Sequence, residues 1–342
     1  MSGKTTHAER GATLCELART RAAVVVAMIA CCVVVAAALG AAAGAGASEP
    51  AYRLTKATLS DCTASAEADS AIESTSGALL EGLSFVEGNP FFLNVREALV
   101  SDCRFPLPTE KFVEKCEWKY DDAGNVRTAT FYKSTNELSR VQLSYDEHGS
   151  ASKVIGWTYA DEGDGRGVVR HDFEMSIVNE KLSGSAYGAN KFTVVHDDTT
   201  SNDTVLFTYD KDKNLNTVTS KGKHEWAVDI SYITAQKVPK TLKLSEDEKG
   251  AGAYLAPTYD GANKLVSLKR GTWEGDEVQL SGDEYVIQYS GSKYSKVRYY
   301  QDDVEVKYYD FKYDEHGNLT SIRVYKKGGV QLYNITFAYE LA

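Results

Sequence analysis

The sequence predicts a mainly β fold, an antiparallel meander of hairpins that rolls into a barrel, half-barrel or spiral. Three observations predict this class. Tyrosine, which favours pleated and half-buried surfaces, occurs 21 times in 342 residues. A Tyr-Asp turn pattern recurs after residue 110. Residues 22–39 form an uncharged apolar run, which adds one N-terminal membrane helix. A small N-terminal helical segment is expected between that helix and the repeats.

Residues 1–47 are predicted to be a signal peptide or membrane anchor. Lys4, Arg10 and Arg19 precede the apolar run and favour a cytoplasmic N-terminus, which places the following residues outside the cytoplasm. The segment is retained as an anchor through residues 22–39, cleaved after Ala47, or lipidated at Cys31. The sequence leaves these three fates open. In each case we expect an extracytoplasmic protein, anchored to the membrane or secreted.

Residues 48–110 are predicted to be a small helical region or stalk. Ile72, Leu79 and Leu83 have the spacing of one amphipathic helix, and Pro106 marks the boundary with the repeats. Cysteines outside the membrane are free to form disulfides. Cys62 and Cys103 both follow Ser-Asp and are the favoured pair, which leaves Cys116 unpaired or paired between chains.

Residues 111–342 are predicted to be a β-repeat domain. The pattern is clearest at Tyr120, Tyr145 and Tyr313, where apolar-x-Tyr-Asp is followed by a turn that contains glycine. Apolar-x-Tyr places both side chains on one face of a strand, because strand side chains alternate. Asp-x-x-Gly is turn chemistry, since Asp bonds the nearby backbone and Gly adopts left-handed angles. Each unit is therefore strand, tight turn, strand.

This pattern resembles the YD repeat of the RHS family, whose consensus is close to Tyr-Asp-x-x-Gly-Arg-Leu. The resemblance covers about residues 112–342, with Asn at positions 125 and 318 in place of Arg, and with glycine replaced at Lys213 and Asn263. It implies a small, degenerate bacterial surface protein built from rolled hairpins. It does not imply a toxin shell, because this chain is short and has no toxin-like domain after the repeats.

Charge and motifs narrow the function classes. The net charge of −10 disfavours nucleic acid, which requires a basic face. The sequence contains no HExxH, GxSxG, GxGxxG or phosphate-binding loop. We therefore predict no catalytic, cofactor-binding or metal-binding residues, and the sequence leans against an enzyme without excluding one.

Two sets of residues are candidates for binding. The adjacent pairs Tyr299-Tyr300 and Tyr308-Tyr309 each place one ring away from the core, where it is able to meet a glycan or a protein. Connections between hairpins are rich in carboxylates and should share one rim, at Asp161, Asp164, Asp197, Asp198, Asp302 and Asp303. That rim is suited to calcium or to a basic partner, and ordinary solvated loops are the alternative.

The sequence favours a surface-displayed binding scaffold for a glycan, a protein or an envelope component. A carrier that holds an apolar ligand inside the rolled sheet is the alternative, and a hydrolase is a weaker one. An exposed aromatic patch favours the scaffold, whereas a closed tunnel lined by Tyr and Leu favours the carrier. A transmembrane β-barrel has the same alternation but conflicts with charged strand positions such as Lys296 and Arg298.

Overall fold

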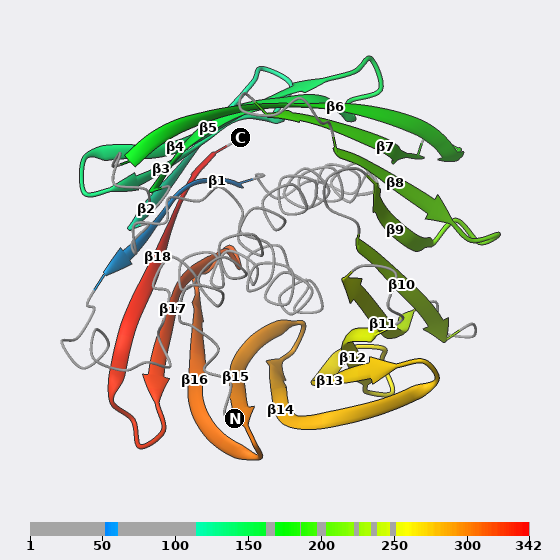
Figure 1. The fold of residues 1–342 in the computed structure, drawn as a ribbon. Helices are drawn as coiled ribbons and strands as arrows, with labels where there is room; N and C mark the ends of the chain where they lie inside the picture. Colours follow the sequence, from blue (N-terminus) through cyan, green and yellow to red (C-terminus); the bar gives the residue numbers. More distant parts are fainter. Residues whose placement is uncertain are drawn as a thin grey trace, which may run out of the picture.

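The computed structural model describes a closed barrel of antiparallel strands (Figure 1). The described residues are 52–60, 114–161, 168–184, 186–196, 203–221, 226–233, 238–246 and 251–341. Each strand pairs with its neighbours in the chain, and the last strand pairs with the first. The strands are β1 Tyr52–Ser60, β2 Lys115–Tyr120, β3 Val126–Lys133, β4 Asn136–Tyr145, β5 Ala151–Asp161, β6 Val168–Ser183, β7 Ala186–His196, β8 Asp203–Tyr209, β9 Leu215–Lys221, β10 Trp226–Ile233, β11 Val238–Glu246, β12 Ala251–Tyr259, β13 Leu265–Glu274, β14 Glu277–Ser290, β15 Lys293–Gln301, β16 Val304–Tyr313, β17 Leu319–Lys326 and β18 Gln331–Leu341.

The predicted antiparallel meander is confirmed, and of the three predicted shapes the structure is the barrel. Strand β1 closes the ring, because it pairs with β18 along one side and with β2 along the other. We expect a helical region over residues 48–110, and for β1 this expectation is wrong. Ala57 and Leu59 alternate with polar residues and face the core, which is strand periodicity.

The other N-terminal predictions lie outside the described residues. These are the membrane segment 22–39, lipidation at Cys31, the helices after Ala64, and the Cys62–Cys103 disulfide. The described part of the chain contains no helix, and therefore none long and apolar enough to cross a membrane. Cys116, on β2, is buried.

The turn chemistry predicted from the repeat is present in five hairpins. In each, an Asp carboxylate accepts the backbone N–H four residues on, at 2.8–2.9 Å, and the residue three positions on has positive φ. The five carboxylates belong to Asp121, Asp146, Asp210, Asp260 and Asp314. Where glycine is lost, Lys213 (φ 66°) and Asn263 (φ 61°) adopt the same left-handed angles. The carboxylate therefore sets the turn even without glycine.

Tyrosines near the ends of several strands also have a defined role. Tyr145 at the end of β4 donates its hydroxyl to the carbonyl of Val126 at the start of β3, at 2.8 Å. Five further tyrosines make the same bond to Leu54, Ala189, Leu215, Leu265 and Leu319, at 2.6–3.0 Å, and they are Tyr120, Tyr209, Tyr232, Tyr289 and Tyr339. These six rim tyrosines thus satisfy buried hydroxyls and tie neighbouring strands together at one end of the barrel.

Replacing Lys213 with glycine should raise the free energy of unfolding by about 1 kcal/mol, because left-handed angles strain a residue that carries Cβ. Gly149→Ala should lower it by a similar amount. Gly149 is a clean control, since nothing lies within 4 Å of an added Cβ there. Urea midpoints measure both changes. If both substitutions moved the urea midpoint in the same direction, the left-handed turn geometry would be contradicted.

Removing the hydroxyl of Tyr232 should cost about 1 kcal/mol, because Tyr232→Phe leaves the carbonyl of Leu215 without its donor. Tyr259 occupies the equivalent place on β12, but its buried hydroxyl has no hydrogen-bond partner. Tyr259→Phe should therefore leave stability unchanged or raise it. The two variants are compared by urea unfolding. Equal losses in the free energy of unfolding would refute the hydrogen-bonding role of the rim tyrosines.

Candidate functional site

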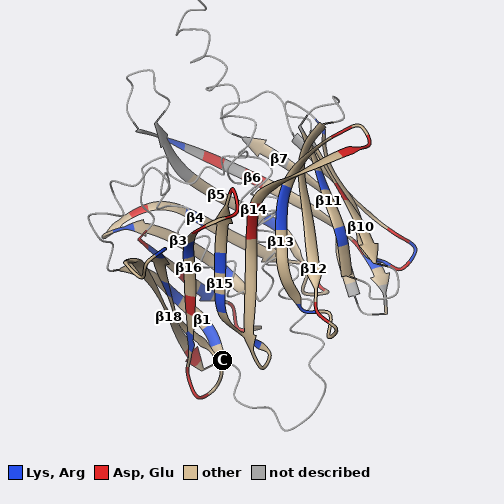
Figure 2. Cartoon of the chain, turned by 90° about the horizontal axis from the view of Figure 1, so that it is seen from below, with Lys and Arg blue, Asp and Glu red and all other residues tan. Residues whose placement is uncertain are grey.

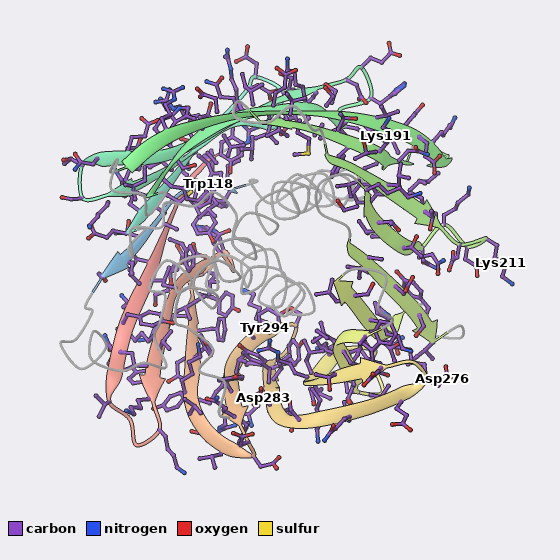
Figure 3. All side chains as sticks on the ribbon, viewed as in Figure 1. Trp118, Lys191, Lys211, Asp276, Asp283 and Tyr294 are labelled. Atoms are coloured by element: carbon purple, nitrogen blue, oxygen red, sulfur yellow. The ribbon has the colours of Figure 1, made fainter. Side chains whose placement is uncertain are left out.

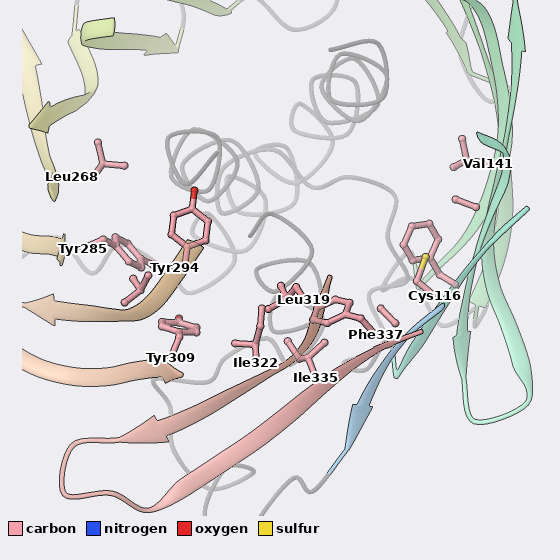
Figure 4. Close-up of a cluster of buried hydrophobic side chains, with 14 of the residues drawn as sticks. Cys116, Val141, Leu268, Tyr285, Tyr294, Tyr309, Leu319, Ile322, Ile335 and Phe337 are labelled. Atoms are coloured by element: carbon pink, nitrogen blue, oxygen red, sulfur yellow. The ribbon is translucent and has the colours of Figure 1, made fainter. Parts of the chain in front are cut away.

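The two faces of the barrel wall differ sharply in polarity. Alternate side chains point into the barrel, and most of these are apolar (Figure 4), among them Leu268, Ile322, Ile335 and Phe337. Charged side chains lie on the outer face, and Figure 2 shows Lys, Arg, Asp and Glu along β13–β16. In Figure 3, Trp118 and Tyr294 lie on the inner side, and Lys211 and Asp276 project outwards. The structure thus offers two candidate surfaces, an apolar inner wall and a polar outer one.

Aromatic rings are packed together on the inner wall between β14 and β16. Tyr285 and Tyr309 are each 1% exposed, and the Tyr285 ring lies 4.6 Å from that of Tyr299. Burial raises the pKa of Tyr294, whose ring lies 5.7 Å from Phe311. These tyrosines therefore belong to the core. Tyr299 and Tyr309, both predicted binding residues, are members of this inner group.

The other tyrosine of each predicted pair faces outwards. Tyr308 alternates with the buried Tyr309, and Tyr300 follows Tyr299 across a bulge in the β15–β16 pairing. Around Tyr308 we define the tyrosine–cation patch as Lys296, Arg298, Tyr300, Tyr308 and Tyr325. Strand register assembles it, because Tyr308 lies opposite Arg298 on β15 and opposite Tyr325 on β17.

Contacts hold the Tyr308 ring from both neighbouring strands. Tyr325 stacks on it from β17, with centroids 5.0 Å apart and planes at 16°. Lys296 on β15 places its ammonium nitrogen 4.4 Å from the ring centroid, within the range of a cation–π interaction. The two contacts come from opposite sides of β16. Tyr308 is thus fixed in one orientation.

Ion pairs between strands surround the patch. Lys296 lies 3.0 Å from Asp310, and Arg298 lies 3.5 Å from Glu305. On β14, Glu284 lies opposite Tyr300 and is bonded to the hydroxyl of Ser267. Exposed pairs of this kind contribute about 1 kcal/mol or less to stability, so they mainly orient the side chains. The patch is a surface of mixed charge with ordered aromatic rings.

The predicted acidic rim is described only in part. Asp164, Asp197 and Asp198 lie outside the described residues, and Asp161 ends β5 with its side chain outside them as well. Asp302 and Asp303 form the exposed turn between β15 and β16, with φ of 49° and 63°. No group of three or more potential metal ligands occurs among the residues that the structure describes. Calcium, a basic partner and ordinary solvated loops therefore stay the alternatives for this rim.

Tyr325 and the cations of the patch are the members that sequence reasoning missed. Period-two alternation identifies which residues of one strand share a face. It does not identify which residue of the next strand lies opposite, because register depends on the bulges and turns. The strand pairs on either side of the Tyr325–Tyr308 stack each contain a bulge. One lies at Val324/Tyr325 in the β17–β18 pairing, and the other lies at Tyr299/Tyr300 in the β15–β16 pairing.

No protein-family model and no curated protein matches the chain. Among solved structures it is similar to a porin-like protein from Bacteroides uniformis ATCC 8492, with 9% identity and a TM-score of 0.38 over 66% of this chain and 95% of that one. A porin-like protein from Bacteroides vulgatus ATCC 8482 gives 10% identity and a TM-score of 0.28 over 68% and 96%. The TcdB2-TccC3-Cdc42 structure gives 10% identity and 0.31 over 66% of this chain and 14% of that one.

Membership of the YD-repeat RHS family, expected from the sequence, is wrong. No family model matches, and the eighteen strands of the described part of the chain close into one barrel. The physical reason is that Tyr-Asp-x-x-Gly encodes a local hairpin. A local turn does not fix how many hairpins follow or whether the sheet closes. TM-scores this low leave the function of this chain to be argued from its own residues.

Alkaline pH should destabilise the protein through its buried tyrosines. Burial raises the pKa of Tyr120, Tyr232, Tyr259 and Tyr313 to about 12, from an ordinary value of 10.0. The unfolded chain then loses protons first, so this stability is fully present below pH 10 and falls as pH rises towards about 12. Urea midpoints and phenolate absorbance measure it. If the tyrosines of the native chain ionised over the same pH range as those of the urea-unfolded chain, the predicted loss of stability would be contradicted.

Proposed function

We propose that the protein is an extracytoplasmic binding scaffold that presents the tyrosine–cation patch to a partner protein. The observation that carries the proposal is the ordered Tyr308 ring, held between Tyr325 and Lys296 on the outer wall. Tyrosine and arginine are enriched at protein interfaces, and a ring already held in place loses little entropy on binding. The patch contains both the arginine, Arg298, and the ring that is already held in place, Tyr308.

The outer wall is suited to water rather than to lipid. Lysine, arginine and carboxylate side chains recur along the outward rows, as in the pairs Lys153–Glu174 and Lys296–Asp310. A lysine or arginine on the lipid face of a membrane-spanning barrel costs about 2–4 kcal/mol near the midplane. This supports a barrel displayed outside the bilayer. The predicted N-terminal segment supplies the export signal or the anchor.

A protein partner fits the patch better than a stacked sugar does. Sugars bind aromatic side chains by lying on a ring face. Both faces of Tyr308 are already covered, by Tyr325 from β17 and by Lys296 from β15. The patch presents ring edges, a hydroxyl and paired charges instead, which are suited to the polar and aromatic mixture of a protein interface.

A second candidate function is a carrier of an apolar ligand inside the barrel. It is favoured by one observation, the closed ring with an inner wall of Leu, Ile, Val and Tyr. Mass spectrometry of an organic extract of the purified protein tests it. Co-purified lipid in stoichiometric amount would favour the carrier, and the patch variant described next would then leave ligand content unchanged.

Substitution of the patch should abolish partner capture. The full chain, immobilised, is exposed to fractionated envelope proteins of the producing cells, and bound proteins are identified and quantified. Tyr308→Ala with Tyr325→Ala should reduce capture of the specific partner at least tenfold, as expected for an interface hot spot of about 2 kcal/mol or more. Ile155→Ala, on the outer face of β5 and 39% exposed, is the matched control.

Capture that survives in the double variant, or binding to a glycan array with no protein captured, would show that this patch is not a protein interface. Circular dichroism of each variant confirms that the barrel is intact.

A further inference from the structure

The β13–β14 hairpin extends beyond its neighbour β15. Strand β14 pairs with β13 from Glu277 onwards, but its pairing with β15 begins only at Glu284. Just before that point, the carbonyl of Gly282 accepts the backbone N–H of Asp303 in the β15–β16 turn, at 2.9 Å. Among the described residues, no strand pairs with residues 277–281 on that side. We call residues 277–281 the open edge of β14.

Alternate residues of the open edge direct their backbone groups away from β13. Glu277 lies opposite Glu274 across a two-residue turn, so these two form a hydrogen-bonded pair. Bonded and non-bonded pairs alternate along an antiparallel ladder. Val278 and Leu280 therefore direct both their N–H and their C=O groups to the open side. The carbonyl of Gly282, which bonds to the β15–β16 turn on that side, follows the same alternation.

The open edge is accessible and has one apolar face. Every residue from 277 to 281 is exposed, and Val278 and Leu280 are 41% and 47% exposed. They share a face with Trp273, which lies opposite Val278, whereas the residues between them are polar. An accessible strand edge with alternating apolar side chains is the surface to which an extended peptide adds as a further strand.

Carboxylates lie at both ends of the open edge. Asp276 and Glu277 lie at the hairpin end, where Asp276 projects away from the barrel (Figure 3). Asp302 and Asp303 lie at the other end, because the backbone of Asp303 bonds to the strand there. Within the described part of the chain, none of these four carboxylates takes part in an ion pair. Their charge is thus available to a basic partner.

We infer that the open edge is a docking site for an extended basic segment of a partner protein, which adds as an antiparallel strand to β14. The backbone of that segment bonds to Val278 and Leu280, and its alternate apolar side chains lie beside theirs. A lysine or arginine at each end of the segment meets the carboxylates. Polar side chains occupy the positions between the apolar ones.

A second copy of this chain is a poorer occupant of the open edge. Antiparallel pairing of two such edges would bring Asp276 of one copy close to Asp302 and Asp303 of the other. Like charges at these positions oppose the pairing, which is a common way in which proteins protect a strand edge. The same carboxylates attract a basic strand, so they select the partner as well as exclude the copy.

This inference goes beyond the proposed function, because the open edge is a separate surface from the tyrosine–cation patch. The two surfaces adjoin, since Tyr300 of the patch lies opposite Glu284, where β14 begins to pair with β15. Docking at the edge depends on the backbone of β14 and not on the patch rings. Tyr308→Ala with Tyr325→Ala should therefore leave it unchanged.

Fluorescence anisotropy with the full chain and a labelled peptide tests the inference. The probe is the end-blocked peptide Arg-Thr-Val-Thr-Val-Thr-Arg, whose valines are spaced to lie beside Val278 and Leu280. It should bind, and more weakly as the salt concentration rises. Glutamate in place of both arginines should weaken binding about tenfold or more. N-methylation of both valine amides should weaken it equally, whereas N-methylation of the threonine amide between them is the matched control.

Two variants of the chain locate the docking site. Val278→Pro removes one donor of the open edge and should weaken peptide binding about fivefold, as expected for a lost hydrogen bond. Proline is tolerated where a strand N–H faces solvent. Asp302→Asn with Asp303→Asn should weaken binding to a similar extent and reduce its salt dependence, and asparagine tolerates the positive φ there. Asp122→Asn with Asp212→Asn, at exposed turn positions elsewhere, is the charge-matched control.

Hydrogen exchange of the unsubstituted chain provides a reading that does not depend on any variant folding. The basic peptide should slow exchange at residues 277–281 several-fold and leave exchange in the β3–β4 hairpin unchanged. Unchanged exchange at 277–281 with millimolar peptide would overturn the inference, and so would equal binding of the arginine and glutamate peptides. Failure of partner capture at the tyrosine–cation patch, with peptide docking intact, would contradict only the proposed function.

Discussion

Closure of β1 against β18 is the constraint on which the rest of the structure depends. An open sheet of this size would expose two edges of unpaired N–H and C=O groups, which invite pairing with another chain. Residues Tyr52–Ser60 pair with β18 on one side and with β2 on the other, so neither edge remains. Because closure joins the first described strand to the last, it requires the complete chain. The barrel is therefore expected to fold as one cooperative unit rather than hairpin by hairpin.

The rim tyrosines show how a short repeat is compatible with that closure. The rings of Tyr145, Tyr209, Tyr289 and Tyr339 pack against the core, while each hydroxyl donates to a carbonyl on the preceding strand. One side chain thus provides apolar area and satisfies a buried polar group at the place where strands end. A phenylalanine repeat would provide only the area. Tyr259, whose hydroxyl has no hydrogen-bond partner, marks a place where this pattern is incomplete.

Local features could be predicted from the sequence, and long-range features could not. Asp146 and Gly149 identify a turn because the interaction spans four residues, and the structure has that turn. The outward orientation of one tyrosine in each pair follows from alternation, which is also local. The identity of the outward residue depends on bulges such as the one at Tyr299/Tyr300, and these are set by pairing with the next strand. Ring closure and the Tyr325–Tyr308 stack depend on register across the sheet, for which the repeat contains no signal.

Strand number and wall polarity together decide what kind of barrel this is. A barrel whose outer face meets lipid needs apolar residues outside and tolerates water inside. Here the charges lie outside and the apolar side chains point inwards, where Ile322 and Val297 have no exposed surface. With 18 strands, the ring is too wide for its own side chains to meet across the centre. An apolar wall around an empty space of that width would lose most of the hydrophobic stabilisation that favours closure. The same ring that removes the sheet edges thus creates a demand for internal packing.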